Sequence, residues 1–189
     1  MSSAVGVLLA AGAGTRMGRP KALVTGPDGD PWVRTAARAL HEGGCGRVVV
    51  VVGAARDDVT SLLADLPWTE PVVAADWSRG MSASLAAGLG ALSGTDADCA
   101  VIGLVDTPDV GAEVVERVLA ATGTSRAALG RAAYGGVPGH PVVLGRDHWA
   151  ATLGMASGDR GARDYLSAAP PLLVECEDLA SGRDVDARG

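Results

Sequence analysis

Phenylalanine is absent from this sequence of 189 residues, and aromatic residues make up only 3% of it. The core must therefore be built mainly from Val, Ala and Leu, whose compact side chains suit close packing of helices on a sheet. Hydrophobic residues still account for 48% of the chain, enough for one well-buried domain and too little for two. We expect a single domain over residues 1–189.

The sequence also lacks an excess of basic residues and any long apolar run. Its formal net charge is −6, whereas a general nucleic-acid binder needs a basic surface to neutralise phosphates. No apolar run approaches the roughly 20 residues of a membrane-spanning helix, and no basic leader precedes the first apolar run, as a signal peptide would require. These absences predict a cytoplasmic protein that binds neither nucleic acid nor membrane.

Cysteine is scarce, and its spacing matches no known framework. Cys45, Cys99 and Cys176 lie far apart, without a CxxC metal motif or the even number of cysteines typical of a disulfide scaffold. We interpret them as three buried, reduced thiols.

Short apolar runs alternate with helical patterns along the chain. The runs at 47–52 and 99–105 show no polar alternation, which is typical of parallel strands covered by helices on both faces. The expected strands are 5–10, 47–52, 72–74, 99–105, 142–144 and 172–175, and the expected helices are 31–42, 57–66, 82–92 and 111–121. This order predicts an α/β three-layer sandwich with a mostly parallel, Rossmann-like sheet and helices on both faces. Loops at the carboxyl ends of the strands, after Ala10, Ala74 and Val105, should converge on one cleft.

The strongest functional signal is the loop LLAAGAGTRMGRPKAL at residues 8–23. Its glycines let backbone N–H groups approach phosphate oxygens, while Arg16 and Lys21 supply positive charge. A Rossmann fingerprint fits poorly because Gly18 comes one residue too late and no acidic residue ends the strand at 47–52. A Walker A loop is excluded because no GK[ST] follows. A plain glycine-rich turn leaves the two cations unexplained.

This loop resembles the signature of the MobA-like NTP transferases, which include molybdenum cofactor cytidylyl- and guanylyltransferases. It is similar, more distantly, to sugar-phosphate and methylerythritol-phosphate nucleotidyltransferases. Four further segments resemble the family in the expected order: DWSRGMSASLAAGL (76–89), GLVDTPDV (103–110), GGVPGHPVVLGRDHW (135–149) and GDRGARDYL (158–166). The resemblance implies a fold of the nucleotide-diphospho-sugar transferase type.

The resemblance also implies a set of nucleotide contacts. The loop glycines and Arg16 would wrap the triphosphate, Lys21 would steady the transition state, and Asp76 and two serines would lie beside the base and ribose. Ser82 alternatively caps a helix. The implied nucleotide-binding residues are Leu9, Ala10, Ala11, Gly12, Gly14, Thr15, Arg16, Lys21, Asp76, Ser82 and Ser84.

The carboxylate Asp106 directly follows a buried strand. There it can be presented as an oxygen ligand for Mg²⁺, which commonly combines one or two carboxylates with substrate phosphates. Alternatively Asp106 caps the next helix, a role we expect rather of Asp109. The resemblance implies a second metal ligand from the C-terminal sequence, Asp186 or less clearly Asp184, although these residues also fit a solvated acidic tail.

Acceptor contacts are expected at Gly139-His140-Pro141, which resembles an element of the cytidylyltransferase branch. His140 would touch the phosphate or pterin of an acceptor, or would simply be a satisfied polar residue in a turn. Asp159, with Arg160 and Arg163, would line the same side. His41 and His148 are interpreted as surface or helix-end residues.

The resemblance therefore implies an Mg²⁺-dependent nucleotidyltransferase whose catalytic residues are Arg16, Lys21 and Asp106. The expected reaction moves NMP from an NTP, preferably CTP, to a phosphate-bearing acceptor such as molybdopterin and releases pyrophosphate. GTP or a sugar phosphate stays open, and a molybdoenzyme or its chaperone is a candidate partner. Two other classes remain: an NAD(P)H-dependent oxidoreductase on the same fold, and a catalytically silent nucleotide-binding module or chaperone.

Overall fold

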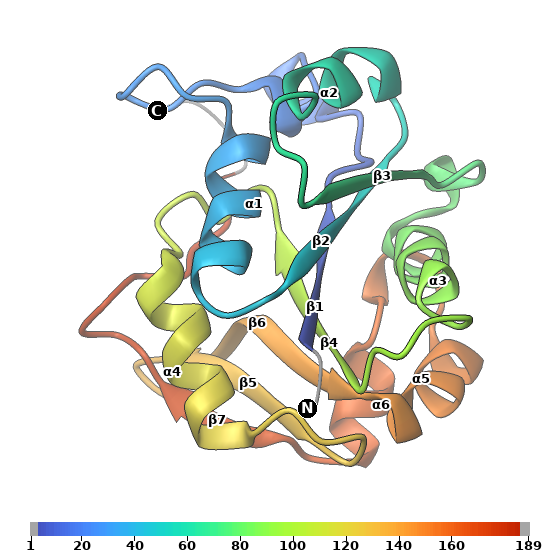
Figure 1. The fold of residues 1–189 in the computed structure, drawn as a ribbon, viewed down its shortest axis with the longest axis vertical. Coiled ribbons are helices and arrows are strands. Elements are labelled where there is room, and N and C mark those ends of the chain that lie inside the picture. Colours follow the sequence, from blue (N-terminus) through green and yellow to red (C-terminus); the bar gives the residue numbers. More distant parts are fainter. Residues whose placement is uncertain (1–3, 186–189) are drawn as a thin grey trace.

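The computed structural model describes residues 4–185 and shows helices packed on both faces of one sheet (Figure 1). Within this part of the chain, seven strands follow the order β3-β2-β1-β4-β6-β5-β7. The strands are β1 (Ala4–Leu9), β2 (Arg47–Val52), β3 (Thr69–Val73), β4 (Cys99–Leu104), β5 (Leu129–Tyr134), β6 (Val137–Gly145) and β7 (Leu172–Glu175). The helices are α1 (Trp32–Glu42), α2 (Arg56–Leu62), α3 (Met81–Ala91), α4 (Ala112–Thr122), α5 (Trp149–Met155) and α6 (Arg163–Ala168).

The sheet is mostly parallel, as the sequence predicted, and β6 is the exception. Parallel pairs join β1 to β2 and β4, β2 to β3, and β5 to β7. Strand β6 runs antiparallel to both β4 and β5. Its direction follows from the connection, since Gly135 and Gly136 join β5 to β6 with φ values of 60° and 77°. Two residues at positive φ form the tight turn of an antiparallel hairpin.

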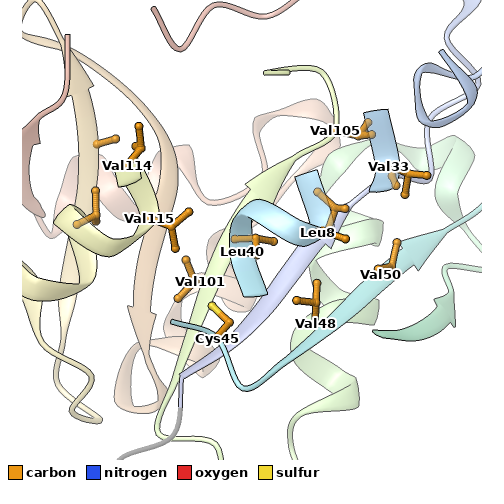
Figure 2. Close-up of a cluster of buried hydrophobic side chains, with 14 of the residues drawn as sticks. Leu8, Val33, Leu40, Cys45, Val48, Val50, Val101, Val105, Val114 and Val115 are labelled. Atoms are coloured by element: carbon orange, nitrogen blue, oxygen red, sulfur yellow. The ribbon is translucent and has the colours of Figure 1, made fainter. Parts of the chain in front are cut away.

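Alternating side chains of the central strands build a separate core on each face. Leu8 of β1 points toward α1, α2 and α4, whereas its neighbours Val7 and Leu9 point toward α3, α5 and α6. Figure 2 shows the first of these cores, where Val33 and Leu40 of α1 lie among apolar side chains of the sheet. Strands β1, β2 and β4 are thus buried on both faces, which explains their unbroken apolar runs.

Small residues bring the helices close to the sheet. On α3, a Cβ at Gly88 would lie 2.5 Å from Cγ1 of Val7 in β1, so only glycine fits there. The three cysteines are free and buried, as expected. Burial raises the pKa of Cys45 to about 12 and that of Cys99 to about 11, so both thiols stay protonated.

Several boundaries differ from the sequence prediction. The helix expected at 82–92 begins at Met81 and is capped by Gly80, whose φ of 105° and ψ of −173° favour glycine, so Ser82 is not the cap. The helix expected at 57–66 ends at Leu62. Strand β5 and the helices α5 and α6 were not predicted, because their mixed sequences lack a clear period. None of the helices in residues 4–185 has the length and apolar character needed to cross a membrane.

We expect Leu8→Ala to lower the free energy of unfolding by about 2–5 kcal/mol, the cost of deleting a fully buried leucine side chain. Leu8 is 0% exposed on a strand buried on both faces. Urea denaturation followed by circular dichroism measures the loss. Leu172→Ala is the matched control, since Leu172 is 51% exposed in β7, and its midpoint should barely move. Equal losses in the two variants would contradict the two-faced core.

Candidate active site

The candidate site lies where the chain turns from one half of the sheet to the other. From β1 the chain first adds β2 and β3 on one side, and β4 then pairs with β1 on the other side. Leu9 and Leu104, the last residues of β1 and β4, are directly paired. The loops that follow them therefore leave the sheet side by side, at the kind of switch point where open α/β sheets bind ligands.

The glycine-rich loop leaves β1 through two buried residues. Ala10 donates its N–H to Val51 O at 3.0 Å, and Ala11 O accepts from Ala54 N at 3.1 Å, so both are anchored to the end of β2. From Gly12 the loop turns outward, and Gly12, Thr15 and Arg16 are exposed. Of the expected nucleotide-binding residues, the structure thus exposes Gly12, Thr15 and Arg16, whereas Leu9, Ala10 and Ala11 are buried.

Gly14 sets the shape of this loop. Its φ of 60° and ψ of 41° place it in the left-handed region before a short 3-10 turn, η1 (Thr15–Met17). A Cβ at Gly14 would lie 1.9 Å from Arg19 O, so a larger residue would force the loop open. This tight fold directs the chain back toward the sheet and places Lys21 at the start of the next 3-10 turn, η2 (Lys21–Leu23).

Lys21 and Asp106 meet at the switch point. The Nζ atom of Lys21 donates to Oδ2 of Asp106 at 2.6 Å, and the two side chains are 17% and 20% exposed. Lys21 is also the only lysine in the sequence. Two of the three residues expected to be catalytic are therefore in direct contact, although they lie 85 positions apart.

The alternative role of Asp106 as a helix cap is not observed. Helix α4 begins at Ala112 after Gly111, and no side chain caps it. The prediction that Asp109 is the cap is wrong for the same reason. Its Oδ2 atom accepts from Ser181 N at 2.7 Å and from Ser181 Oγ at 2.6 Å, so Asp109 holds the C-terminal segment in place.

That C-terminal segment passes beside Asp106. Val185 donates its N–H to Asp106 O at 2.9 Å, and Asp184 lines the adjacent cavity. Asp186, the expected second metal ligand, lies outside the described residues. Within residues 4–185 no cluster of three or more His, Cys, Asp or Glu side chains could hold a metal ion. The donor set fits Mg²⁺ nevertheless, because that ion takes few protein carboxylates and completes its shell with water and phosphates.

A cavity of about 780 Å³ adjoins the switch point on the face covered by α3 and α6. Leu9 and Leu104 form one end of it, and the C-terminal segment 177–184 closes another side. The expected acceptor residues Gly139, His140 and Asp159 all line it. Asp159 also lies against the first turn of α3, since a Cβ at Gly80 would be 2.5 Å from its Oδ1 atom. Sequence segments far apart in the chain thus meet around one space.

The residues expected beside the base lie elsewhere. A second, more open hollow of about 600 Å³ is lined by residues 53–58 and 73–75 and by Trp77, at the carboxyl ends of β2 and β3. Asp76 belongs to this segment but is exposed and ion-paired with Arg79 at 3.6 Å. Ser82 and Ser84 lie in the first turn of α3, where Ser84 is buried. Of the described residues, none in the segment 12–21 lines either hollow. The glycine-rich loop therefore lies exposed beside the ends of the strands and forms no wall of a pocket.

His140 differs from a histidine in an exposed turn. It is half-buried in β6, and Tyr134 donates its O–H to His140 O at 2.6 Å. Burial, with the positive charge of Arg131 as the second cause, lowers the pKa of His140 to about 3. The imidazole is therefore neutral at ordinary pH and can offer an acceptor one hydrogen-bond donor but no positive charge.

The other two histidines lie at helix ends, one of the two places that the sequence predicted, and both make contacts within the fold. His41 at the end of α1 stacks on Trp68 with ring centroids 4.2 Å apart. The Nε2 atom of His148 lies 3.1 Å from Ala127 O, and its Nδ1 atom lies 2.6 Å from the hydroxyl of Tyr165. Because a carbonyl can only accept, Nε2 carries the proton and Nδ1 accepts from the tyrosine.

Sequence reasoning missed Arg131 and Tyr134, which line the cavity from the unpredicted strand β5. An arginine within a short apolar segment was the available signal. It could not be interpreted without the register that places Arg131 opposite Val142.

Residues 6–172 match the model of the MobA-like NTP transferase domain. A protein named nicotine blue oxidoreductase, from Paenarthrobacter nicotinovorans, is 39% identical over 96% of this chain and 91% of its own length. Among solved structures, Rv0371c from Mycobacterium tuberculosis H37Rv superposes with a TM-score of 0.79 at 25% identity, covering 98% of this chain and 94% of that one. The structure of Rv0371c in complex with manganese superposes with a TM-score of 0.73 at 23% identity, covering 93% of this chain and 88% of that one. A nucleotidyl transferase from Methanothermobacter thermautotrophicus superposes with a TM-score of 0.79 at 21% identity, covering 99% of this chain and 93% of that one.

We expect His140 to make stability depend on pH. The unfolded chain takes up a proton near pH 6.5, whereas folded His140 does so only near pH 3. The unfolded state therefore binds more protons between these values, and the free energy of unfolding falls as the pH falls, by at most about 1.4 kcal/mol per pH unit. Urea titrations from pH 7 to pH 4 should show a smaller slope in His140→Gln. Identical slopes would contradict a depressed pKa.

Proposed function

This chain belongs to the MobA-like NTP transferase family, and from that premise we propose that it transfers NMP from an NTP to a phosphate-bearing acceptor. CTP is the proposed donor and molybdopterin the proposed acceptor, with pyrophosphate as the second product. The contact between Lys21 and Asp106 carries this proposal, because it brings a cation and a carboxylate that could hold a metal together at the switch point.

The chemistry requires charge neutralisation more than proton transfer. An acceptor phosphate oxygen is already anionic, so it can attack the α-phosphorus in line without a strong general base. The exposed amides of the glycine-rich loop and the fork of Arg16 would hold the triphosphate oxygens. Lys21 would then donate to an oxygen on which negative charge increases in the transition state.

Asp106, with a carboxylate of the C-terminal segment at Asp184 or Asp186, would hold the divalent cation. When bound, Mg²⁺ supplies neutralisation of phosphate charge and a fixed orientation for the phosphate oxygens. The manganese complex of the mycobacterial structural relative supports a divalent cation of this kind. Lys21 and the cation would share Asp106, so we expect Lys21 to turn from Oδ2 toward the phosphates when nucleotide binds.

The two hollows suit the two substrates. The cavity of about 780 Å³ lies within the range of roughly 300–1,000 Å³ typical of small-molecule sites. Its apolar wall and its arginines suit a bulky, anionic acceptor such as a pterin phosphate. We assign the base and ribose to the side of Asp76, whose neighbours Ala75 and Trp77 line the second hollow, and of Ser82 and Ser84 in the helix that follows. We assign the acceptor to Gly139, His140 and Asp159. A molybdoenzyme or its chaperone would receive the product.

Lys21→Ala should lower kcat/KM for pyrophosphate release by roughly 100- to 1,000-fold, the usual loss when one preorganised donor to a developing charge is removed. Arg47→Ala is the control, because Arg47 lies at the amino end of β2, far from the switch point, and pairs with Glu70. Coupled pyrophosphate detection measures both variants. Since Lys21 is the only lysine, amine-specific acetylation should reproduce the loss and NTP should protect against it. Near-normal turnover by Lys21→Ala would contradict the proposed role of Lys21 in the transition state.

The test of the reaction is pyrophosphate release from each of the four NTPs, with Mg²⁺ and molybdopterin-loaded acceptor. We expect release with CTP, and its loss in Asp106→Ala, because that variant lacks the carboxylate proposed to hold the metal. Release with another NTP would keep the class and change the donor. Absence of release with every NTP and acceptor would overturn the proposal.

A redox function is the second candidate, because a relative 39% identical over 96% of this chain is named an oxidoreductase. The glycine-rich loop would then bind the pyrophosphate of a nicotinamide dinucleotide. No carboxylate ends β2, but Asp57 and Asp58 line the hollow beside it and could receive ribose hydroxyls. Oxidation of NAD(P)H at 340 nm by the purified protein, with a quinone-like dye as acceptor and without pyrophosphate release, would favour this candidate.

A further inference from the structure

Arg131 occupies an unusual place for a charged residue. It lies in the middle of β5, opposite Val142 of β6, which in turn pairs with Ile102 of β4. Val142 and Ile102 belong to the buried core beneath α3, α5 and α6. Because directly paired residues share a face of the sheet, Arg131 projects on this apolar face, where its guanidinium lines the cavity.

The protein provides hydrogen-bond acceptors for only some of the N–H donors of this guanidinium. Its Nε and Nη2 atoms both donate to Gly139 O, at 3.0 and 2.9 Å. A guanidinium has five N–H donors, so the two bonds to Gly139 O leave further donors without a protein partner, in a residue that lines the cavity. Within residues 4–185, no carboxylate lies within ion-pair distance of Arg131. The acids that line the same cavity are Asp159, Glu177, Asp178 and Asp184, and Asp178 is paired with Arg117.

A second guanidinium reinforces the positive charge. Arg163, the first residue of α6, lines the same cavity. Burial, and next the like charge of Arg163, lower the pKa of Arg131, in keeping with two cations that line one cavity. A half-buried cation with a like neighbour and no counter-ion costs folding free energy. An anion bound between them would remove that cost.

We propose that Arg131 and Arg163 form an oxyanion-binding subsite for a second anionic group of the acceptor. The ligand is a phosphate, carboxylate or metal oxyanion gripped by the planar fork of Arg131. Its identity as part of the acceptor rests on the proposed function, whereas the subsite itself follows from the two arginines and the cavity.

This subsite is distinct from the place where the acceptor reacts. Arg131 is two strands away from Ile102 of β4, and Asp106 is four residues beyond Ile102. At about 4.8 Å per strand and 3.3 Å per residue, the backbones of Arg131 and Asp106 lie on the order of 15 Å apart. With its backbone this far from Asp106, Arg131 is placed to bind a second anionic group of the acceptor rather than the phosphate that would react beside Asp106.

The opposing explanation is that Arg131 only ties β5 to Gly139. In that case its removal would weaken the protein and leave anion binding unchanged. If Arg131 instead forms an anion-binding site, replacing it with the apolar, similarly long methionine removes an uncompensated charge. Arg131→Met should then melt at a higher temperature than the wild type without anion and should fail to gain stability from anion.

The experiment measures the melting temperature against concentration of phosphate, molybdate and acetate at constant ionic strength. Because an anion that binds the native state stabilises it, the wild type should respond to at least one of the three, and the anion that acts identifies the group. Titrations are repeated with Arg16→Ala, since the glycine-rich loop is also expected to bind phosphate. Arg126→Met is the control, because Arg126 pairs with Asp147 at 3.3 Å and does not line the cavity. The rise in melting temperature with anion should persist in Arg16→Ala and Arg126→Met, should be lost in Arg131→Met and should be reduced in Arg163→Ala.

An anion response that disappears in Arg16→Ala but persists in Arg131→Met would overturn the subsite, as would no response to any of the three anions. In the transfer assay, Arg131→Met should raise the KM for the acceptor by roughly 10- to 100-fold, the loss expected for hydrogen bonds to a charged group, with the KM for NTP unchanged. If no transfer occurs in any protein while the anion response depends on Arg131, the proposed function fails and the subsite stands.

Discussion

The pairing of β1 with β4 is the constraint on which the rest of the site depends. Both strands are buried on both faces, so a slip of one residue in their register would exchange the side chains of the two cores. The register is therefore fixed, and it sets Leu9 opposite Leu104. Only with these strand ends aligned can the loop after β1 return Lys21 to within 2.6 Å of Asp106.

The two halves of the sheet divide the site between them. The parallel half, β3-β2-β1-β4, ends in the glycine-rich loop and the hollow proposed for the nucleotide. The other half contains the antiparallel hairpin of β5 and β6, whose turn is held by Glu175, since its carboxylate accepts from Gly135 N and Gly136 N at 2.9 Å each. Tyr134 in this hairpin packs so closely on Gly182 that a Cβ there would lie 2.0 Å from its ring. The hairpin and the C-terminal segment thereby enclose the larger cavity.

Sequence patterns predicted the parts of this structure that depend on local periodicity. Strands β1, β2 and β4 were recognisable because burial on both faces leaves an unbroken apolar run, and Asp106 was recognisable because it follows one. Strand β5 was missed because an arginine and small residues interrupt its pattern. Asp109 was misassigned as a cap, and Ser82 does not take its alternative role as one, since the bonds to Ser181 and the backbone angles of Gly80 arise from tertiary structure. The same holds for Arg131, whose meaning depends on a register that no single segment encodes.

The contact between Lys21 and Asp106 also bears on the choice between the two candidate functions. Ion pairs that remain partly exposed contribute little to stability, about 0–1 kcal/mol, and deeper ones pay a desolvation cost. A gain in folding stability therefore does not explain why the only lysine of this sequence lies against Asp106. Hydride transfer from a nicotinamide does not explain this contact either, because it needs no carboxylate to hold a metal at the switch point. Phosphoryl chemistry would use both groups there, one to hold a divalent cation and one to neutralise the transferring phosphate. The pair therefore supports the proposed nucleotidyl transfer, even beside a relative named for oxidation and reduction.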